Sequence, residues 1–261
     1  MRCAWPLAVV KSVFERPHHQ RIATVLSSLD GGLLKEHGCL FGGGTVIALR
    51  FGEYRESVDI DFLLSDMTRY RNLRQLLTST DGINALLLPG SHPLTQLRDI
   101  RADQYGIRTM LSVAGQPIKF EVILEGRIEL AAPTVKDLIC GIPTLTVLDM
   151  IASKLLANSD RWADDGVFNR DLIDLAMMQP QLPLLRQAIV KSETAYGEAI
   201  CGDLEKAINR LQHRQGWFDH CMQSMAMTLP KALVWQRVRN LHKALATIGQ
   251  RQEVILPALD R

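Results

Sequence analysis

The sequence predicts an α+β protein in which a β-sheet domain over residues 1–130 is followed by a helical domain over residues 131–261. Two β-patterned runs, residues 104–113 and 118–124, flank a glycine-containing turn and predict a hairpin. A further strand is expected at residues 59–62, where two aspartates alternate with apolar residues. Beyond about residue 135 the apolar residues recur only at helical spacing, so the boundary is placed near residue 130.

Composition places the chain among ordinary globular proteins. Its 261 residues are 47% hydrophobic and 22% charged, which allows two modest domains and excludes disordered and fibrous classes. A net charge of +2 and a pI near 8.3 neither require nor exclude a nucleic-acid partner. Scattered cysteines without C-x-x-C spacing predict reduced thiols in a cytoplasmic protein. They are Cys3, Cys39, Cys140, Cys201 and Cys221.

No membrane partner is expected. The first residues, Met1–Lys11, mimic a secretory leader because a cation precedes an apolar run, but the run is short and contains Pro6. Nowhere do about eighteen apolar residues follow one another, so no transmembrane helix is predicted.

A turn of three glycines, Gly42–Gly44, follows a first helical region at residues 17–36, which we expect to break at Gly31-Gly32. A short amphipathic helix is predicted to start at Thr45. The free N–H groups and the positive dipole end of a helix start attract phosphate, and glycines let the backbone approach it closely. The turn therefore predicts a phosphate site, to which Thr45 adds a hydroxyl.

Two aspartates follow about fifteen residues later, at Asp59 and Asp61. Residues two apart on a strand share a face, so both carboxylates point the same way while Ile60 and Phe62 point into the core. Two like charges held side by side are tolerated mainly where a cation neutralises them. This spacing predicts a divalent-metal site.

Taken together, Gly43-Gly44-Thr45, Arg55, Ser57 and Asp59-Ile60-Asp61 resemble the signature of the polymerase-beta-type nucleotidyltransferases. More narrowly, G-G-T…R-x-S-x-D-I-D is similar to the AbiEii/AbiGii toxin family, to which MenT-type toxins also belong. The resemblance implies a mixed sheet, an NTP substrate, and Mg²⁺ or Mn²⁺. It also implies the toxin of a toxin–antitoxin or phage-defence system, which adds nucleotides to tRNA or another RNA and has a cognate antitoxin as a possible partner.

Glu121 is the candidate for a third carboxylate. Along residues 118–124, Ile118, Phe120 and Val122 are expected to face the core, while Lys119 and Glu121 face away. The superfamily resemblance brings a third acid, on a neighbouring strand, to the aspartate pair. The alternative is that Lys119 and Glu121 form an ordinary solvent-facing pair.

The helical half carries two further motifs. Thr146 and Asp149 predict a capping box that opens a helix, on which Lys154 and Arg161 share one face. A second helix carries Asp171 and Asp174. Lys154-Leu-Leu-Ala with Arg161, and R-D-x-x-D-L, resemble downstream motifs of the AbiEii-type family, which implies roles for Lys154 and for Asp171 or Asp174. The residues alone equally fit ion pairs on a solvated surface, and Lys154 is expected to be partly exposed.

The resulting hypothesis places the nucleotide in a cleft between the two domains. Asp59, Asp61 and Glu121 would hold the metal, with Glu121 or Asp59 accepting a proton. The glycine turn, Thr45, Arg55, Ser57 and Lys154 would hold the phosphates. Two alternatives remain open, namely transfer of a nucleotide or phosphate to a protein acceptor, and a non-catalytic nucleotide-binding or RNA-binding module.

Overall fold

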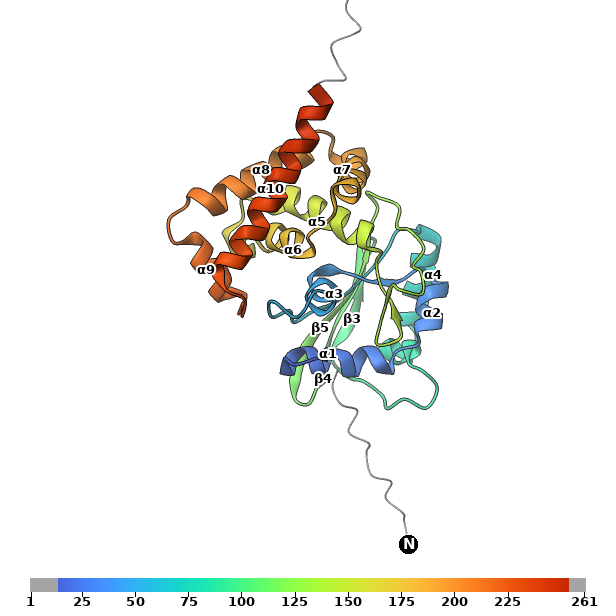
Figure 1. Cartoon of the computed structure of the whole chain (residues 1–261). Coiled ribbons are helices and arrows are strands. Elements are labelled where there is room, and N and C mark those ends of the chain that lie inside the picture. Colours follow the sequence, from blue (N-terminus) through green and yellow to red (C-terminus); the bar gives the residue numbers. More distant parts are fainter. Residues whose placement is uncertain (1–13, 254–261) are drawn as a thin grey trace, which may run out of the picture.

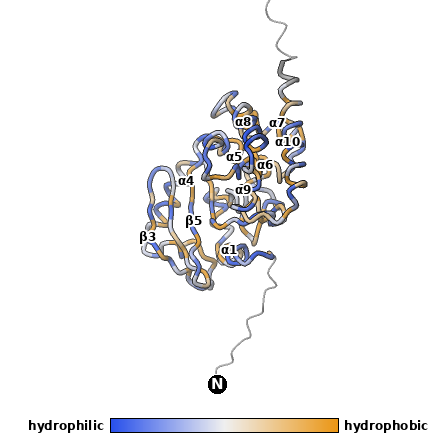
Figure 2. Tube along the Cα trace, turned by 90° about the vertical axis from the view of Figure 1, so that its left-hand side faces the viewer, coloured by the Kyte–Doolittle hydropathy of each residue, from blue (hydrophilic) through white to orange (hydrophobic). Residues whose placement is uncertain are grey.

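The computed structural model describes residues 14–253, which form a sheet lobe and a helical lobe (Figure 1). The leader-like start and Cys3 lie outside these residues. Hydrophobic and hydrophilic residues alternate along the elements of both lobes (Figure 2). None of the helices described is long and apolar enough to cross a membrane.

The sheet lobe is built on a five-stranded mixed sheet in the order β1-β2-β5-β4-β3. Neighbours β2 and β5 are parallel, whereas the other neighbouring pairs are antiparallel. The strands are β1 Leu40–Phe41, β2 Ile60–Leu64, β3 Thr95–Ala102, β4 Gly106–Val113 and β5 Gln116–Leu124. The predicted hairpin is confirmed as β4 and β5, which pair from Gly106 opposite Ile123 to Val113 opposite Gln116.

Alternation along β2 and β5 separates a buried face from a polar one. Ile118, Phe120 and Val122 are at most 1% exposed, as predicted, because they face the core with Ile60 and Phe62. The Phe62 ring lies between Phe41 and Phe120, with centroid distances of 5.7 and 5.4 Å. The opposite face is therefore left to Asp61 and Glu121.

Helices cover the sheet lobe. They are α1 Pro17–Ser28, α2 Gly31–Glu36, α3 Gly43–Arg50, α4 Met67–Leu77 and a 3₁₀ helix, η1 Gly82–Leu86. The expected break at Gly31-Gly32 falls two residues earlier, because Asp30 caps α2 by accepting the N–H groups of Gly32 and Leu33.

The helical lobe follows from Thr146. The predicted helix start is confirmed, since Thr146 Oγ1 caps α5 by accepting the Asp149 N–H, but the Asp149 carboxylate accepts from the Thr146 hydroxyl and not from the backbone N–H that a full capping box uses. The elements are α5 Val147–Arg161, η2 Asp165–Val167, α6 Arg170–Met178, α7 Leu182–Tyr196, α8 Ala199–His213, α9 Trp217–Ser224 and α10 Lys231–Glu253.

The short helix α3 joins the two lobes, because it packs on β2 and also on α5 and α6. All residues from Thr45 to Leu49 are buried, so the prediction of an amphipathic helix was wrong. A helix that is covered on all sides must be apolar all round. The helix also begins at Gly43 rather than Thr45, which makes two of the glycines its first turn.

Residues 131–145 pack with the sheet lobe. They include a small hairpin, β6 Leu138–Ile139 and β7 Ile142–Pro143, although no β structure was predicted beyond residue 130. Strand β7 contacts α2 and β1, and Thr144 forms a bridge to Phe41. The division at residue 130 remains a prediction, and these contacts favour a boundary nearer Thr146.

Candidate active site

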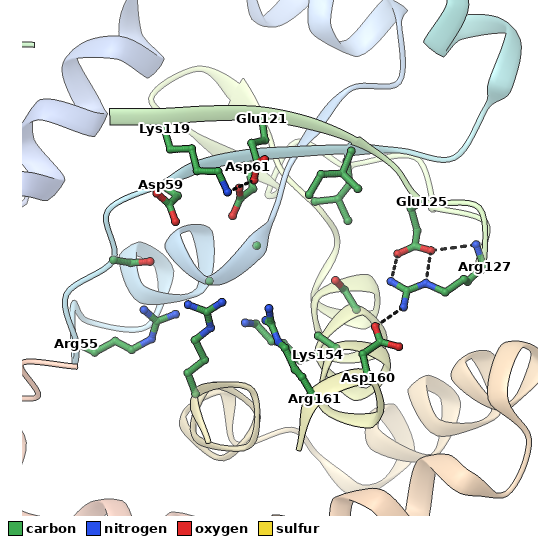
Figure 3. Close-up of a pocket in the computed structure, with 18 residues that line it drawn as sticks. Arg55, Asp59, Asp61, Lys119, Glu121, Glu125, Arg127, Lys154, Asp160 and Arg161 are labelled. Carbon is green, nitrogen blue, oxygen red and sulfur yellow. Dashed lines mark hydrogen bonds and ion pairs between the residues drawn. The ribbon is translucent and has the colours of Figure 1, made fainter. Parts of the chain in front are cut away.

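A cavity of about 410 Å³ lies where the two lobes meet. Asp59, Asp61 and Glu121 lie on one side of it, and Arg55, Lys154 and Arg161 on the other (Figure 3). The cavity thus has an acidic wall from the sheet lobe and a basic wall drawn mainly from the helical lobe.

The acidic wall rests on strand register. Asp61 of β2 is paired directly with Glu121 of the parallel strand β5, and neighbouring strands lie about 4.8 Å apart. Asp59 comes immediately before β2 and also lines the cavity. The structure therefore places Glu121 on the same side of the sheet as the aspartate pair.

The carboxylates influence one another. Burial raises the pKa of Asp61 to about 6, and the charges of Asp59 and Glu121 act in the same direction. Glu121 is itself paired, with Lys119 Nζ 2.6 Å from Oε2 and Arg108 Nε 3.1 Å from Oε1. Lys119, which was expected only as a possible solvent-facing partner, thus belongs to the cavity lining.

The acidic wall fits a divalent cation by its chemistry. It offers only carboxylate oxygens, the donors that Mg²⁺ and Mn²⁺ prefer. The ammonium of Lys119 lies 2.6 Å from Glu121 Oε2, which shows that the negative charge of this wall suits a cation. Over the part of the chain described, no group of three His, Cys, Asp or Glu side chains is placed so that it could hold a metal ion.

The glycine turn brings backbone N–H groups to the cavity. Gly43 and Gly44 occupy the first turn of α3 and line the cavity, and phosphate binding at this turn stays a prediction. Gly43 has a φ of 68°, and a Cβ there would collide with the Asp61 carboxylate. At Gly44 a Cβ would collide with the Arg55 guanidinium. Both positions therefore need glycine for close packing.

Thr45 does not line the cavity, in contrast to the expectation that it contacts phosphate. It is 1% exposed, and its hydroxyl donates to the carbonyl of Asp59 at 2.6 Å and lies 2.8 Å from Ser57 Oγ. Thr45 thus holds the loop before β2, whereas Ser57 itself reaches the cavity.

His19 holds the same loop from the other side. Its buried ring accepts the Ser57 N–H at Nε2 (3.1 Å) and contacts Glu53 Oε1 through Nδ1 (2.7 Å). Burial lowers the pKa of His19, although Glu53 opposes the shift. The neutral ring, with its proton on Nδ1, satisfies both bonds.

Buried aspartates organise the basic wall. Asp174 is fully buried and accepts from Arg55 Nε (2.7 Å), Arg55 Nη2 (2.9 Å), Tyr54 Oη (2.5 Å) and Lys154 Nζ (2.7 Å). Burial opposes the ionisation of Asp174, but Arg55 and Lys154 hold its pKa below the usual range. All of its oxygens are occupied, and it does not line the cavity.

Asp171 acts in the same way. It accepts from Lys154 Nζ at 2.8 Å and from Arg161 Nε at 2.8 Å. Burial opposes its ionisation too, yet Lys154 and Arg161 hold its pKa well below the usual range. Lys154 and Arg161 share a face, as predicted, but Lys154 is only 5% exposed, so the expectation of a partly exposed lysine was wrong.

Arg170 differs from the other cations of the basic wall. It begins α6 and lines the cavity, but among the described residues nothing makes a hydrogen bond or an ion pair with its side chain. In the sequence, Arg170 was noted only as the first residue of the R-D-x-x-D-L motif, and no role was predicted for it. Its free guanidinium is therefore available to a ligand.

A second polar group at the cavity was missed from the sequence. Arg127 donates to both oxygens of Glu125 and to Asp160 Oδ2 at 2.7 Å, and Asp160 Oδ1 accepts from Tyr196. The alternation that selected Glu121 also puts Glu125 on the same side of the sheet. This network joins the end of β5 to α5 and α7.

Comparison with known proteins gives one family and a small set of solved structures. The profile described as nucleotidyl transferase AbiEii toxin, type IV TA system, matches residues 31–244. Comparison with curated proteins gives no match. JHP933 from Helicobacter pylori has a TM-score of 0.51 at 16% identity, over 94% of this chain and 97% of that chain.

A second solved structure is that of a candidate nucleotidyltransferase from H. pylori. It has a TM-score of 0.49 at 16% identity, over 91% of this chain and 96% of that chain. At such low identity, JHP933 supports the fold alone.

Proposed function

Because the chain belongs to the AbiEii family of nucleotidyl transferase toxins, we propose that it transfers a nucleotide from an NTP to the hydroxyl of an RNA, with tRNA as the first acceptor to test. The observation that carries this proposal is the register pair of Asp61 and Glu121 beside Asp59, facing a basic wall across one cavity. A module that only bound nucleotides would not need three carboxylates there.

The triphosphate fits the basic wall and the first turn of α3. Among the described residues, Arg55, Lys154 and Arg161 share ion pairs with two carboxylates, those of Asp171 and Asp174, and Arg170 pairs with none, so these ion pairs leave two of the four positive charges unmatched. The N–H groups of Gly43 and Gly44 add the positive end of a helix dipole. This excess of positive charge supports binding of the β- and γ-phosphates.

In the transfer, the acceptor oxygen bonds to the α-phosphorus, the bond to the β-phosphate oxygen breaks, and pyrophosphate leaves. When bound by Asp59, Asp61 and Glu121, a divalent cation would neutralise charge on these phosphate oxygens. We assign the hydroxyl proton to Asp59, because its carboxylate makes no side-chain hydrogen bond among the described residues, whereas Lys119 and Arg108 occupy Glu121.

Labelled nucleotides test the proposal directly. The protein is incubated with Mg²⁺ or Mn²⁺, total RNA and cell lysate, and each NTP is labelled in turn at the α- or the γ-phosphate. We expect the α-label to enter RNA with wild type and not with Asp61→Asn. A γ-label on RNA or protein would indicate phosphoryl transfer instead, and an α-label on protein would identify a protein acceptor. Absence of any label transfer would refute the proposal.

The family's type IV toxin–antitoxin description also supports a cognate antitoxin as a partner. Repeating the labelling assay with the protein encoded by the neighbouring gene tests whether that protein is an antitoxin that inhibits the transfer. Unchanged labelling in its presence would argue against inhibition at this step.

A further inference from the structure

A second cavity, of about 540 Å³, lies on the helical lobe. Its lining comes from η2 and the residues after it, from the link between α8 and α9, and from α9 itself. None of these lining residues belongs to the active-site cavity.

Phe168 and the exposed His220 line this cavity together with Arg214, and the Trp217 ring lies beneath them, only 5% exposed. The ring centroids of Phe168 and His220 are 5.5 Å apart, as are those of Trp217 and His220. Arg214 Cζ lies 4.2 Å from the Trp217 ring centroid, and Trp217 Nε1 donates to Asn169 Oδ1 at 2.5 Å. Aromatic rings and guanidinium planes are the surfaces on which unpaired nucleobases stack.

The backbone holds Phe168 at this cavity in an unusual conformation. Phe168 and Asn169 have φ values of 51° and 50°, in the left-handed region. Asn tolerates that region, but a bulky aromatic residue rarely adopts it. The buried Asn169 side chain ties the segment next to Phe168 to α9 by accepting from Trp217.

The charge beside the rings suits a phosphate. Arg210 and Arg214 both pair with the single carboxylate of Asp165, leaving one positive charge in excess. The side chains of Arg214 and Asp165 are 44% and 54% exposed, so this ion pair contributes little and a phosphate can compete for it. Base stacking and phosphate pairing are thus available within one surface.

A single segment connects the two cavities. Arg161 and Arg170 line the active-site cavity, whereas Asp165 and Phe168 between them line the second one. Phe168 and Arg170 are two residues apart, a span of at most about 7 Å. An RNA end that reacts in the first cavity can therefore place a neighbouring nucleotide in the second.

We propose that Phe168 and His220, which pack against the buried Trp217 ring, stack an unpaired nucleobase of the RNA acceptor, with Arg214 pairing to the adjacent phosphate. This proposal rests on the proposed function, because it assumes an RNA acceptor. It assigns acceptor binding to a surface separate from the nucleotide site.

The test compares Arg214→Ala and His220→Ala with wild type and with Arg71→Ala. Arg71 is an exposed cation on α4 in the other lobe, and its removal controls for loss of charge. We expect the KM for RNA to rise roughly tenfold or more in the first two variants, the scale of one lost stacking contact. The KM for NTP should stay unchanged, and Arg71→Ala should behave as wild type.

Photocross-linking gives a readout that does not depend on turnover. RNA containing 4-thiouridine near its 3′ end is irradiated with the full-length protein, and tryptic peptides are analysed by mass spectrometry. We expect cross-links in peptides 162–170 and 215–231, which carry Phe168 and the Trp217–His220 pair. Cross-links elsewhere, with an unchanged KM for RNA in Arg214→Ala and His220→Ala, would overturn this inference alone. If wild type labels no RNA, the proposed function fails first, and the inference fails with it.

Discussion

Replacing Asp61 by Asn should stabilise the metal-free protein while abolishing its transferase activity. Burial and the charges of Asp59 and Glu121 raise the pKa of Asp61 from 3.8 to about 6, so ionised Asp61 is disfavoured in the folded state. No hydrogen bond of the Asp61 side chain is lost in the substitution, because it makes none among the described residues. The isosteric amide also keeps the close fit against Gly43.

The magnitude follows from the size of the shift. At 1.36 kcal/mol per pKa unit, ionised Asp61 lowers the free energy of unfolding by about 3 kcal/mol. This destabilisation is absent below about pH 4, develops as the pH rises from about 4 to 6, and is constant above pH 6. For a protein of this size it corresponds to a Tm difference of about 6 °C.

The assay is thermal unfolding in EDTA between pH 4 and 8, with Asp81→Asn as the control because Asp81 is exposed and does not line the cavity. The Tm of Asp61→Asn should exceed that of wild type above pH 6 and match it near pH 4. Adding Mg²⁺ should raise only the wild-type Tm. The reasoning is refuted if the Tm difference is absent at pH 7.5, or if it is the same at every pH.

Three other substitutions test the remaining parts of the site. Glu121→Gln should lower turnover about a hundredfold or more, because a metal-ligand charge is lost; equal turnover at saturating Mg²⁺ would remove Glu121 from the site. Lys154→Ala should lower the free energy of unfolding by about 3 kcal/mol in urea titrations, since Asp171 and Asp174 lose a buried cation; a loss below about 0.5 kcal/mol would contradict this. Arg170→Ala should raise the KM for NTP about tenfold with stability unchanged within about 0.5 kcal/mol, and an unchanged KM would exclude a phosphate contact.

Local patterns in the sequence were sufficient for several elements. Residue alternation placed Phe120 in the core and Glu121 on the opposite face, and the capping residues Thr146 and Asp149 located the start of α5. The pairing of β2 with β5 could not be predicted from local patterns, because a parallel pair joins segments that are far apart in the sequence. That Glu121 lies beside Asp61 was expected only from the family resemblance.

The errors share a cause, which is contact between segments that are separated in the sequence. Periodicity describes an isolated helix, so it could not reveal that α3 is covered on every side or that Lys154 faces a buried aspartate. The sequence likewise predicted Thr45 as a phosphate ligand, but its hydroxyl is already hydrogen-bonded to Ser57 in the loop before β2. In each case a partner distant in sequence decides what the side chain contacts.

The ion pair between Arg55 and Asp174 has a consequence for biosynthesis of the protein. Arg55 belongs to the sheet lobe and Asp174 to α6 of the helical lobe, so the basic wall is assembled from both. A nascent chain that has released only its sheet lobe from the ribosome carries the carboxylates and the glycine turn without Lys154, Arg161 or Arg170. Under the proposed function, such a chain lacks most of the positive charge assigned to the triphosphate, and that charge is complete only after α6 has been synthesised.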